Sequence, residues 1–574
     1  MIRVEELSYG VPTKELYKDI SFNLETGDHC VLIGVNGTGK STLADMLIHP
    51  EDYLYDGKII RDDNCRIGYA SQFSAADKDQ DCTVVEYLSE RFIKVQEDIA
   101  AVCEEMATAE DMEEVFARYQ DLLDLNESMD GDNYESNIHK QLYTAGMLGV
   151  KETKLSQISG GEYKVLQIVK EMLLSPNLLV LDEPDAFLDF ENLSSLGKLI
   201  NDYKGTMLVI THNRYLLNHC FNKILHLEKC ELQQYEGNYT EYRCAQLRNK
   251  MELKQQYMDE QEEIERNEEM VQILRKRATL MVNPTIGRAV NAKQSQLDRL
   301  ISRQIDAPVF ELREPDIEFP EVHLEEDKTI LSVEDYSVAF EKSILENVNF
   351  EVKSGEKVAI VGENGAGKTT LVKDIISNTH PSVHIDEETE FAWLSQFKDI
   401  GEKTVYEYMQ DEGFGGAASI KEYLEKYCLD ELDLDQKIEN LSVGEQNLLQ
   451  IAVIAGSKAE FLILDEPTSH LDIYSQTALE RAVAEYKGTV LLISHDFYLI
   501  SNCADYVLLI EDGTIRRIKG RKFRKMVYDK YFDQKYLEID RKRQEIETEI
   551  AHSYKNDNLE AMEKFIGQLE EVSR

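Results

Sequence analysis

Short apolar runs alternate along this chain with longer stretches in which apolar residues recur every three or four positions. Residues 30–33, 178–181, 207–210 and 358–361 are apolar throughout, which is typical of strands buried on both faces of a parallel sheet. Stretches with helical spacing follow the first and the last of these runs. Strands alternating with helices predict an α/β fold, and 574 residues are enough for two to four domains.

The same glycine-rich loop follows two of these strands. The residues from Gly34 to Ser41 read Gly-Val-Asn-Gly-Thr-Gly-Lys-Ser, and those from Gly362 to Thr369 read Gly-Glu-Asn-Gly-Ala-Gly-Lys-Thr. This is the phosphate-binding loop pattern, in which backbone N–H groups and the positive end of the next helix bind phosphate. A strand–helix turn that binds nothing would rarely match the full pattern twice in this context.

The lysines of these loops should reach the outer phosphates, and the hydroxyls of Ser41 and Thr369 should bind Mg²⁺. The expected nucleotide-binding residues of the two loops are Gly34, Asn36, Gly37, Gly39, Lys40, Ser41, Thr42, Gly362, Asn364, Gly365, Gly367, Lys368, Thr369 and Thr370.

Two carboxylates end a buried strand in each half of the chain. We expect Asp182 and Asp465 to hold the Mg²⁺ shell. Glu183 and Glu466 should orient and deprotonate water, a role worth roughly 10²–10⁴-fold in rate. Two acids at a strand end could instead cap the next helix, but their spacing from the phosphate loops disfavours that alternative.

Histidines, serine–glycine turns and glutamines complete the set. His212 and His495 stand at the tips of the next strands and could contact the γ-phosphate, although a lone strand-end histidine is more often structural. Helices open after serine and glycine, which predicts either an anion site or a plain helix cap. Two glutamines, each at a strand end, could sense Mg²⁺ or the attacking water. These residues are Ser159, Gly160, Gly161, Ser442, Gly444, Gln72 and Gln396.

The motifs occur twice in the same order, which establishes an internal duplication. Gln72 and Gln396 are 324 positions apart, but Ser159 and Ser442 are 283 apart, so the first half carries 41 additional residues between these motifs. The whole set resembles the ATP-binding cassette ATPases. That resemblance implies two cassettes that sandwich two ATP molecules head to tail, with the loop lysine and acids of each half facing the serine–glycine signature of the other.

Three positions depart from the pattern of that family. Val443 stands where the signature usually has its first glycine, so the site that it completes is expected to hydrolyse ATP more slowly. Asp185 and Phe187 replace the threonine and histidine found at Thr468 and His470.

Tyr9 is a candidate for stacking on the adenine ring, and an aromatic residue that fills an edge strand is an equal alternative.

Composition limits the possible partners. The formal net charge is −46, which argues against indiscriminate binding to nucleic acid or anionic membranes. The nine cysteines form no C-x-x-C pair, so neither a disulfide framework nor a zinc site is expected. No signal-peptide pattern and no run of about 18 apolar residues is present, so we expect a cytoplasmic protein without a membrane span.

Two helical regions interrupt the duplicated pattern. Between Glu86 and Glu135 there are sixteen acidic and three basic residues at helical spacing, which predicts a helical hairpin with a solvated acidic face. Between the cassettes, residues 242–280 and 288–305 predict two antiparallel helices around a Pro- and Gly-containing tip. Residues 271–304 contain seven basic residues and one acidic residue. The candidate RNA contacts of this hairpin are Arg275, Lys276, Arg277, Arg288 and Lys293.

Paired cassettes joined by such a hairpin resemble the ABC-F proteins. The resemblance implies a ribosome-binding ATPase whose hairpin enters near the peptidyl-tRNA site and contacts rRNA and P-site tRNA. Such a protein is either a translation factor or an antibiotic-resistance ribosome-protection protein, and acts as a monomer with ATP and Mg²⁺. The rival interpretations are the ATP-binding subunit of a transporter with separate membrane partners and a DNA-associated ABC ATPase.

The predicted domains follow from these boundaries. They are a first cassette at 1–240 with a helical insertion at about 86–150, a helical linker at 241–327, a second cassette at 328–520 and a helical C-terminal extension at 521–574. Twelve basic residues between Ile515 and Glu545 alternate with aromatic ones. That composition suits binding to an RNA backbone with some base stacking, or docking of the aromatic side chains on a cassette.

Overall fold

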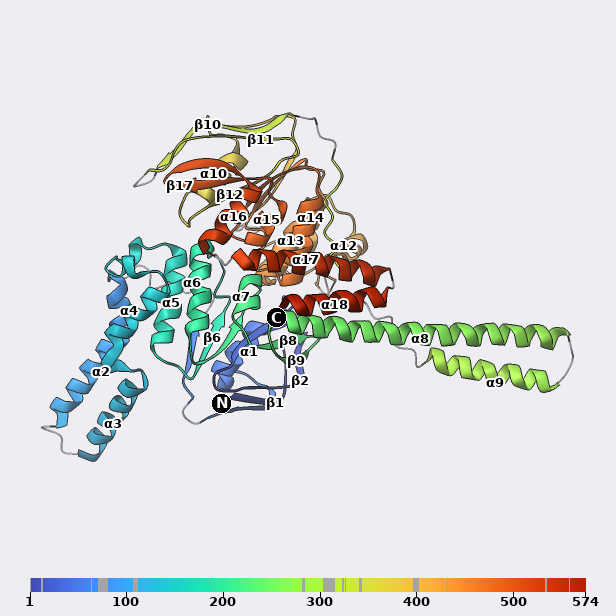
Figure 1. The fold of residues 1–574 in the computed structure, drawn as a ribbon, viewed down its shortest axis with the longest axis horizontal. Coiled ribbons are helices and arrows are strands. Elements are labelled where there is room, and N and C mark those ends of the chain that lie inside the picture. Colours follow the sequence, from blue (N-terminus) through green and yellow to red (C-terminus); the bar gives the residue numbers. More distant parts are fainter. Residues whose placement is uncertain are drawn as a thin grey trace. The chain divides into compact units, whose positions relative to one another are not determined.

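A computed structural model describes most of the chain as two compact units (Figure 1). The described residues are 2–11, 14–62, 65–70, 81–106, 112–186, 188–280, 284–302, 315–322, 325, 327–339, 343–395, 402–430, 432–531, 534–556 and 558–573. The first unit, here called the cassette unit, comprises Met1–Asn238 and Arg313–Asp533. The second, the helical unit, comprises Tyr239–Leu312 and Gln534–Arg574.

The first cassette is built on a six-stranded sheet that is parallel except at one edge. Its order is β5-β6-β7-β3-β8-β9, and β9 is antiparallel to β8. The strands are β3 (His29–Gly34), β5 (Ile67–Ala70), β6 (Leu178–Asp182), β7 (Thr206–Ile210), β8 (Lys223–Glu228) and β9 (Glu231–Glu236). The carboxyl ends of β3, β6 and β7 therefore lie side by side. The phosphate loop follows β3, the acids Asp182 and Glu183 stand at the end of β6, and His212 follows β7. His212 and its counterpart His495 are called the switch histidines below.

A second, antiparallel sheet packs on the first. It contains β1 (Ile2–Val11), β2 (Lys14–Leu24) and β4 (Asp56–Arg61), with β1 in the middle. One apolar cluster joins the two sheets, in which Leu7 and Tyr17 lie with Leu32 and Leu208 and are all fully buried. The helices of this cassette outside its insertion are α1 (Lys40–Ile48), α5 (Gly160–Leu173), α6 (Phe190–Asp202) and α7 (Arg214–His219).

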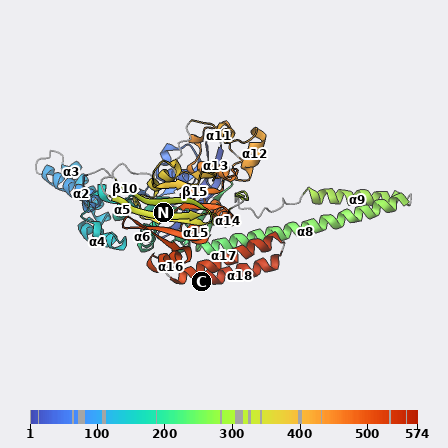
Figure 2. The same ribbon diagram turned by 90° about the horizontal axis from the view of Figure 1, so that it is seen from above.

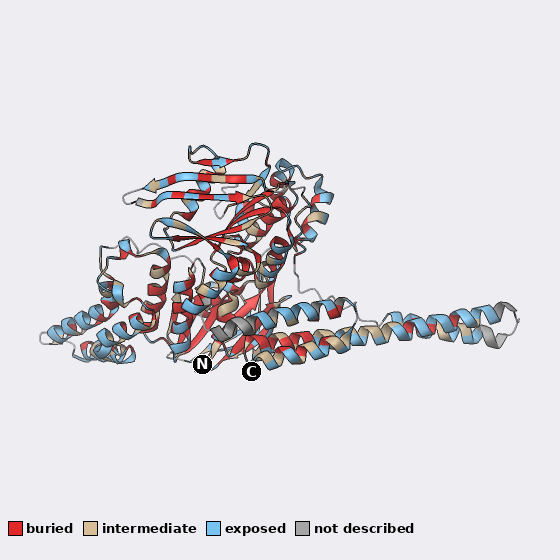
Figure 3. Cartoon of the chain, turned by 45° about the horizontal axis from the view of Figure 1, so that its top comes forward, coloured by how far each residue is buried: buried red, intermediate tan, exposed pale blue. Residues whose placement is uncertain are grey.

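The second cassette repeats this architecture strand for strand, which confirms the duplicated α/β fold. The order of its large sheet is β14-β15-β16-β12-β17-β18, and that of its small sheet is β11-β10-β13. The strands are β10 (Thr329–Ala339), β11 (Ser343–Lys353), β12 (Lys357–Gly362), β13 (Val383–Ile385), β14 (Phe391–Leu394), β15 (Phe461–Asp465), β16 (Thr489–Ile493), β17 (Tyr506–Glu511) and β18 (Thr514–Lys519). Figure 3 shows the central strands of both large sheets as buried.

The helices of the second cassette follow the same order. They are α10 (Lys368–Ser377), α11 (Val405–Asp411), α12 (Ala417–Glu425), α13 (Val443–Ala455), α14 (Ile473–Glu485), α15 (Phe497–Cys503) and α16 (Gly520–Tyr531). Short 3₁₀ turns occur at Pro50–Asp52, Gly131–Asn133, Leu148–Val150, Leu155–Gln157 and Ile438–Asn440.

The acidic insertion of the first cassette is helical, as predicted. It consists of α2 (Val84–Met106), α3 (Met112–Ser128) and α4 (Tyr134–Thr144). Phe92 of α2 stacks on Tyr134 of α4 with ring centroids 5.3 Å apart. The acidic residues face solvent, as the pale colour of α2 and α3 in Figure 3 shows.

The helical unit combines the linker with the end of the chain. Its helices are α8 (Tyr239–Leu280), α9 (Pro284–Ile301), α17 (Gln534–Lys555) and α18 (Leu559–Ser573). Cys244 and Leu247 of α8 are buried in one apolar cluster with Ile550, Met562 and Ile566. The start of α8 is thus one member of a three-helix bundle, and α9 runs back along its far half (Figure 2).

One prediction about this unit needs correction. The second helix of the hairpin begins at Pro284 and not at Arg288. Proline suits the first position of a helix because the N–H that it lacks has no partner there. A small apolar cluster of Ile264, Val271 and Leu297 joins the two helices of the hairpin.

Candidate nucleotide sites

Each phosphate loop holds its lysine between a strand and a helix. The Nζ of Lys40 donates to the carbonyls of Gly34 and Val35 at 2.9 and 3.0 Å. The Nζ of Lys368 donates to those of Gly362 and Glu363 at 2.7 and 3.0 Å. Burial lowers the pKa of both lysines, and the neighbouring carboxylates oppose that shift. Both ammonium groups therefore lie inside the loop, where a phosphate would be bound.

The loop glycines adopt conformations that other residues rarely do. Gly37, Gly39, Gly365 and Gly367 have φ angles of 73°, 90°, 85° and 90°. A Cβ on Gly39 would lie 2.7 Å from the hydroxyl of Tyr17. Ser41 and Thr369 stand exposed on the first helical turn, and Thr42 and Thr370 are partly buried beside them.

The strand-end aspartates are buried next to the loops. Asp182 and Asp465 are 5% and 7% exposed. Burial raises the pKa of Asp182, while a hydrogen bond from Ser41 and the charge of Lys40 oppose the shift. Burial also raises the pKa of Asp465 to about 6, against the charge of Lys368. Among the described residues, the buried Oδ1 of Asp182 has no hydrogen-bond partner, so this oxygen fits the role of a metal ligand beside Ser41.

The glutamates that follow have a strained backbone. Glu183 and Glu466 have φ angles of 46° and 48°, in the left-handed region that non-glycine residues seldom occupy. Their N–H groups donate to the carbonyls of Ile210 and Ile493 at 2.9 and 2.8 Å, which ties each glutamate to the neighbouring strand. Such strain persists where the surroundings fix it, as they do at these two strand ends.

The two glutamates have different neighbours. In the first site, the Oε2 of Glu183 lies 3.1 Å from the Nδ1 of His470, a residue of the second cassette. Burial favours the neutral acid, but the hydrogen bond with His470 and the charge of Lys40 hold the pKa of Glu183 below its usual value. In the second site, the backbone N–H of His495 donates to the carboxylate of Glu466 at 3.2 Å. Burial dominates there and raises the pKa of Glu466 to about 8.

The switch histidines are buried and neutral at physiological pH. Burial and the charge of Lys40 lower the pKa of His212 to about 4. Burial and the charge of Lys368 lower that of His495 to about 3. Within the described part of the chain, both ring nitrogens of His212 lack a hydrogen-bond partner. The Nδ1 of His495 lacks one there as well. Unpaired buried nitrogens are costly, so both rings suit contact with a bound group.

The signature serines act as helix caps and lie opposite the phosphate loops. Ser159 and Ser442 each form a capping box, with Glu162 and Glu445, at the start of α5 and α13. A Cβ on Gly444 would lie 2.0 Å from the side-chain nitrogen of Asn36, and a Cβ on Gly161 would lie 3.2 Å from that of Asn364. The signature of each cassette therefore meets the phosphate loop of the other.

Further contacts close the first site. The side chain of Asn36 donates to the carbonyl of His470 at 2.7 Å, and the backbone N–H of Asn36 donates to the carboxylate of Asp472 at 3.3 Å. Val443 is 48% exposed at the start of α13. Its counterpart Gly160 has open space where a Cβ would be, so a valine fits this position without displacing a neighbour.

A buried lysine near Glu183 was not foreseen from the sequence. The Nζ of Lys164 donates to the carbonyls of Glu183 and Ala186 at 2.7 and 3.2 Å. Burial lowers the pKa of Lys164, and Asp185 is the strongest of the carboxylates that oppose this shift. In the second cassette, Asn447 holds the corresponding loop, donating to the carbonyls of Pro467 and Ser469.

The departure at Asp185 is accompanied by the charge of Lys164, with which Asp185 interacts electrostatically. Where the second cassette has neutral Asn447 and Thr468, the first has the opposite charges Lys164 and Asp185. Asp185 also accepts a hydrogen bond from the hydroxyl of Thr211 at 2.5 Å, and burial raises its pKa to about 6. Aligning the two halves residue by residue would have revealed this paired exchange.

The remaining predicted residues are placed as follows. Tyr9 packs against Tyr17 and Tyr53, with centroids 6.2 and 5.5 Å away, within the small sheet of the first cassette. Gln72, Gln396 and Phe187 lie outside the described residues.

The basic residues of the hairpin gather near its turn. Arg275, Lys276, Arg277 and Arg288 are exposed, and Lys293 is partly buried. Arg275 donates to Gln294 across the two helices at 2.8 Å. The surface at the end of α8 and the start of α9 is thus positively charged on a chain that is acidic overall.

Comparison with protein families supports the cassette interpretation. A model described as ABC transporter matches residues 17–186 and 345–469, just over half of the chain. A second model with the same description matches residues 225–319. Across the described residues, no helix is long and apolar enough to cross a membrane.

Several curated proteins are similar over most of their length. The putative ATP-binding protein YdiF of Bacillus subtilis is 28% identical over 96% of this chain and 85% of its own. The energy-dependent translational throttle protein EttA of Haemophilus influenzae is 28% identical over 87% and 89%. The ribosome protection protein VmlR of Bacillus subtilis is 26% identical over 90% and 88%.

Solved structures share the fold. RNase-L Inhibitor has a TM-score of 0.56 at 18% identity, covering 92% of this chain and 92% of that chain. The archaeal ribosome recycling factor aABCE1, in complex with ribosomal stalk protein aP1, has a TM-score of 0.54 at 19% identity, with coverage of 91% and 90%.

Proposed function

We propose that this chain, which belongs to the ABC transporter family and is a two-cassette ATPase of the ABC-F type, acts on the ribosome. ATP would hold the cassettes together and fix the hairpin on the ribosome, and hydrolysis would release it. The observation that carries this proposal is the exposed basic end of the α8–α9 hairpin on a chain with a net charge of −46.

In each site the residues divide the chemistry. Lys40 and Lys368 bind the outer phosphates, and the signature serine and glycine of the opposite cassette close over them. Glu183 and Glu466 orient and deprotonate the attacking water, with His212 and His495 beside the γ-phosphate. Mg²⁺ held by Ser41 and Asp182, and by Thr369 and Asp465, would neutralise phosphate charge when bound. Gln72 and Gln396 would complete the metal shell, and Tyr9 would stack on the adenine.

The contacts with RNA would be local. The five basic candidates of the hairpin lie on the last turns of α8 and the first turns of α9. Screening limits repulsion from distant acidic residues to about 8–10 Å at physiological salt, so a small basic surface can bind RNA on an acidic protein. We expect this surface to approach rRNA and P-site tRNA. The protein would act either as a translation factor or as a drug-resistance protein. The protein would work in the cytoplasm as a monomer.

Ribosome co-sedimentation at several salt concentrations tests the role of the hairpin. Replacement of Arg275, Lys276 and Arg277 by glutamate should weaken binding at every salt concentration and lower the slope of log affinity against log salt by up to about three units. The matched control replaces Arg91, Lys94 and Lys140, three exposed cations of the acidic insertion, by glutamate. Equal losses in both variants would show that the hairpin has no special role in binding.

A further inference from the structure

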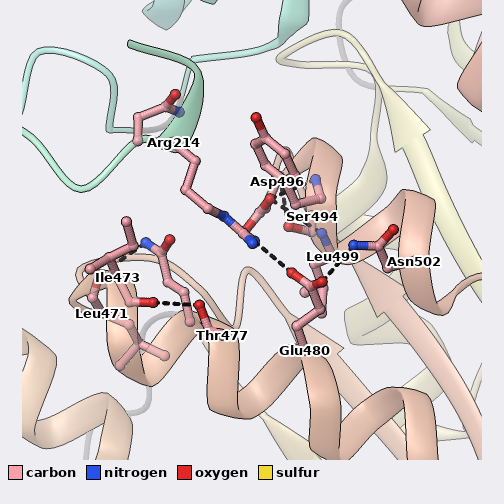
Figure 4. Close-up of polar contacts among 12 residues, drawn as sticks. Arg214, Leu471, Ile473, Thr477, Glu480, Ser494, Asp496, Leu499 and Asn502 are labelled. Atoms are coloured by element: carbon pink, nitrogen blue, oxygen red, sulfur yellow. Dashed lines mark hydrogen bonds and ion pairs between the residues drawn. The ribbon is translucent and has the colours of Figure 1, made fainter. Parts of the chain in front are cut away.

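An arginine links the two cassettes at the switch histidines. Arg214 begins α7, two residues after His212 of the first cassette. Its guanidinium reaches α14 of the second cassette and the loop that contains Asp496, the residue directly after His495 (Figure 4). One side chain thus connects the loop of the first switch histidine with that of the second.

The contacts of Arg214 are short and shielded from solvent. Its Nη2 lies 2.6 Å from the Oε2 of Glu480 and 4.0 Å from the Oδ2 of Asp496. The guanidinium also lies over the ring of Tyr498, 4.1 Å from its centroid. The side chains of Arg214, Glu480 and Asp496 are only 14%, 13% and 15% exposed. A planar arginine that is both paired and stacked is held in one geometry, which a flexible lysine could not reproduce.

The partners of Arg214 are themselves fixed. The other carboxylate oxygen of Glu480 accepts a hydrogen bond from Asn502 at 2.5 Å. Asp496 caps α15, since its Oδ1 accepts from the N–H groups of Tyr498 and Leu499 at 2.8 and 3.3 Å. A shift of Arg214 therefore acts on α14 and on the cap that follows His495, rather than on a loose surface side chain.

The duplicated position is built differently. By the offset of 283, Phe497 corresponds to Arg214 and Gly197 corresponds to Glu480. Phe497 packs on Phe190 of the first cassette, with ring centroids 6.2 Å apart, and Phe190 packs on Phe523 at 6.0 Å. The two cassettes are therefore unlike at this position, since α7 begins with a charged arginine and α15 begins with an aromatic residue.

We propose that Arg214 is a positioning residue that couples the two ATP sites, by tying the loop of His212 to Glu480 and Asp496 beside His495. When nucleotide binds or reacts at one site, the loop that contains the switch histidine of that site moves. Through Arg214 this movement changes the position of the loop that contains the other switch histidine. Coupling of this kind is the free energy by which nucleotide at one site changes the affinity of the other site. It requires that the buried cluster of Arg214, Glu480 and Asp496 be intact.

Steady-state ATP hydrolysis by the full chain tests this proposal without ribosomes. We expect a Hill coefficient for ATP between one and two in the unmodified protein, and a value of about one in Arg214→Gln. Glu480→Gln keeps the shape of the side chain and its partner Asn502 but removes the charge, so it should lower the coefficient in the same way. A purely structural role would lower kcat or thermal stability and leave the coefficient unchanged.

Two controls complete the experiment. Arg516→Gln removes an exposed ion pair with Glu511 between strands β18 and β17 and should keep the Hill coefficient of the unmodified protein. The charge exchange Arg214→Glu with Glu480→Arg should restore part of the cooperativity lost in each single variant. A coefficient of one in the unmodified protein, or an unchanged coefficient in folded Arg214→Gln and Glu480→Gln, would overturn the proposal.

Discussion

The imidazole of His470 lies 3.1 Å from the carboxylate of Glu183, although the two residues belong to different cassettes. Closure of the cassettes therefore changes the electrostatic environment of the residue proposed to activate water. The corresponding position of the first cassette holds Phe187, whose side chain cannot form such a hydrogen bond with Glu466. The two candidate sites are similar in sequence motifs and different in electrostatics.

The pH dependence of hydrolysis should separate the two sites. The pKa of Glu183 is held below its usual value, so this carboxylate is ionised throughout the neutral range. The pKa of Glu466 is raised to about 8, so below that pH it is protonated and cannot accept a proton from water. We expect Glu466→Gln, in which only the first site works, to have a flat profile between pH 6 and pH 9. In Glu183→Gln only the second site works, and its activity should fall by about tenfold for each pH unit well below pH 8.

His470→Phe in the Glu466→Gln background is the matched control. Removal of the imidazole leaves burial as the main influence on Glu183, so the profile of the first site should shift to higher pH. Profiles of Glu183→Gln and Glu466→Gln that superimpose would contradict the assigned difference between the sites.

The exchange of charges at Lys164 and Asp185 predicts non-additive effects. Asp185→Thr removes the strongest opposing charge from a buried ammonium group, and Lys164→Asn leaves Asp185 buried without that cation. Each single change should lower the thermal unfolding midpoint. The double variant copies the second cassette and should recover about 0.5–3 kcal/mol relative to the sum of the single changes. Additive shifts in the midpoint would show that the two residues are independent.

Helix α16 should stabilise the pairing of the cassettes. Phe523 is 1% exposed and packs on Phe190, and Tyr531 accepts a hydrogen bond through its carbonyl from Ser194. Phe523→Ala should cost about 3–5 kcal/mol, measured as a lower midpoint of thermal unfolding. Arg521→Ala, on the exposed face of the same helix, should change stability by less than about 0.5 kcal/mol. Equal shifts would mean that α16 does not hold the interface.

The local elements could be predicted because their signals are short. A fully apolar run next to a glycine-rich loop defines β3 and β12, and it fixes the position of Lys40 and Lys368 without knowledge of any distant residue. The helical character of the end of the chain was also predicted, and α17 and α18 lie there. The docking of Phe523 was one of two alternatives left open by the composition of the tail, and the structure supports it.

The long-range relationships could not be predicted from periodicity. Cys244 and Leu247 lie on a mostly polar helix, and their partners Ile550, Met562 and Ile566 follow about three hundred positions later. Nothing in the first helix indicates which distant segment covers it. The same holds for Arg214. In the sequence it is an arginine two positions after His212, and nothing nearby indicates that it pairs with Glu480 and Asp496.

We propose that hydrolysis at these sites releases the protein from the ribosome. The most direct test is ribosome co-sedimentation with ATP, comparing the unmodified protein with a Glu183→Gln/Glu466→Gln double variant. We expect ATP-dependent retention of the double variant and release of the unmodified protein, because the variant binds nucleotide but cannot activate water. If neither protein sediments with ribosomes at low salt, the proposed site of action is wrong, and the assignment as an ATPase remains.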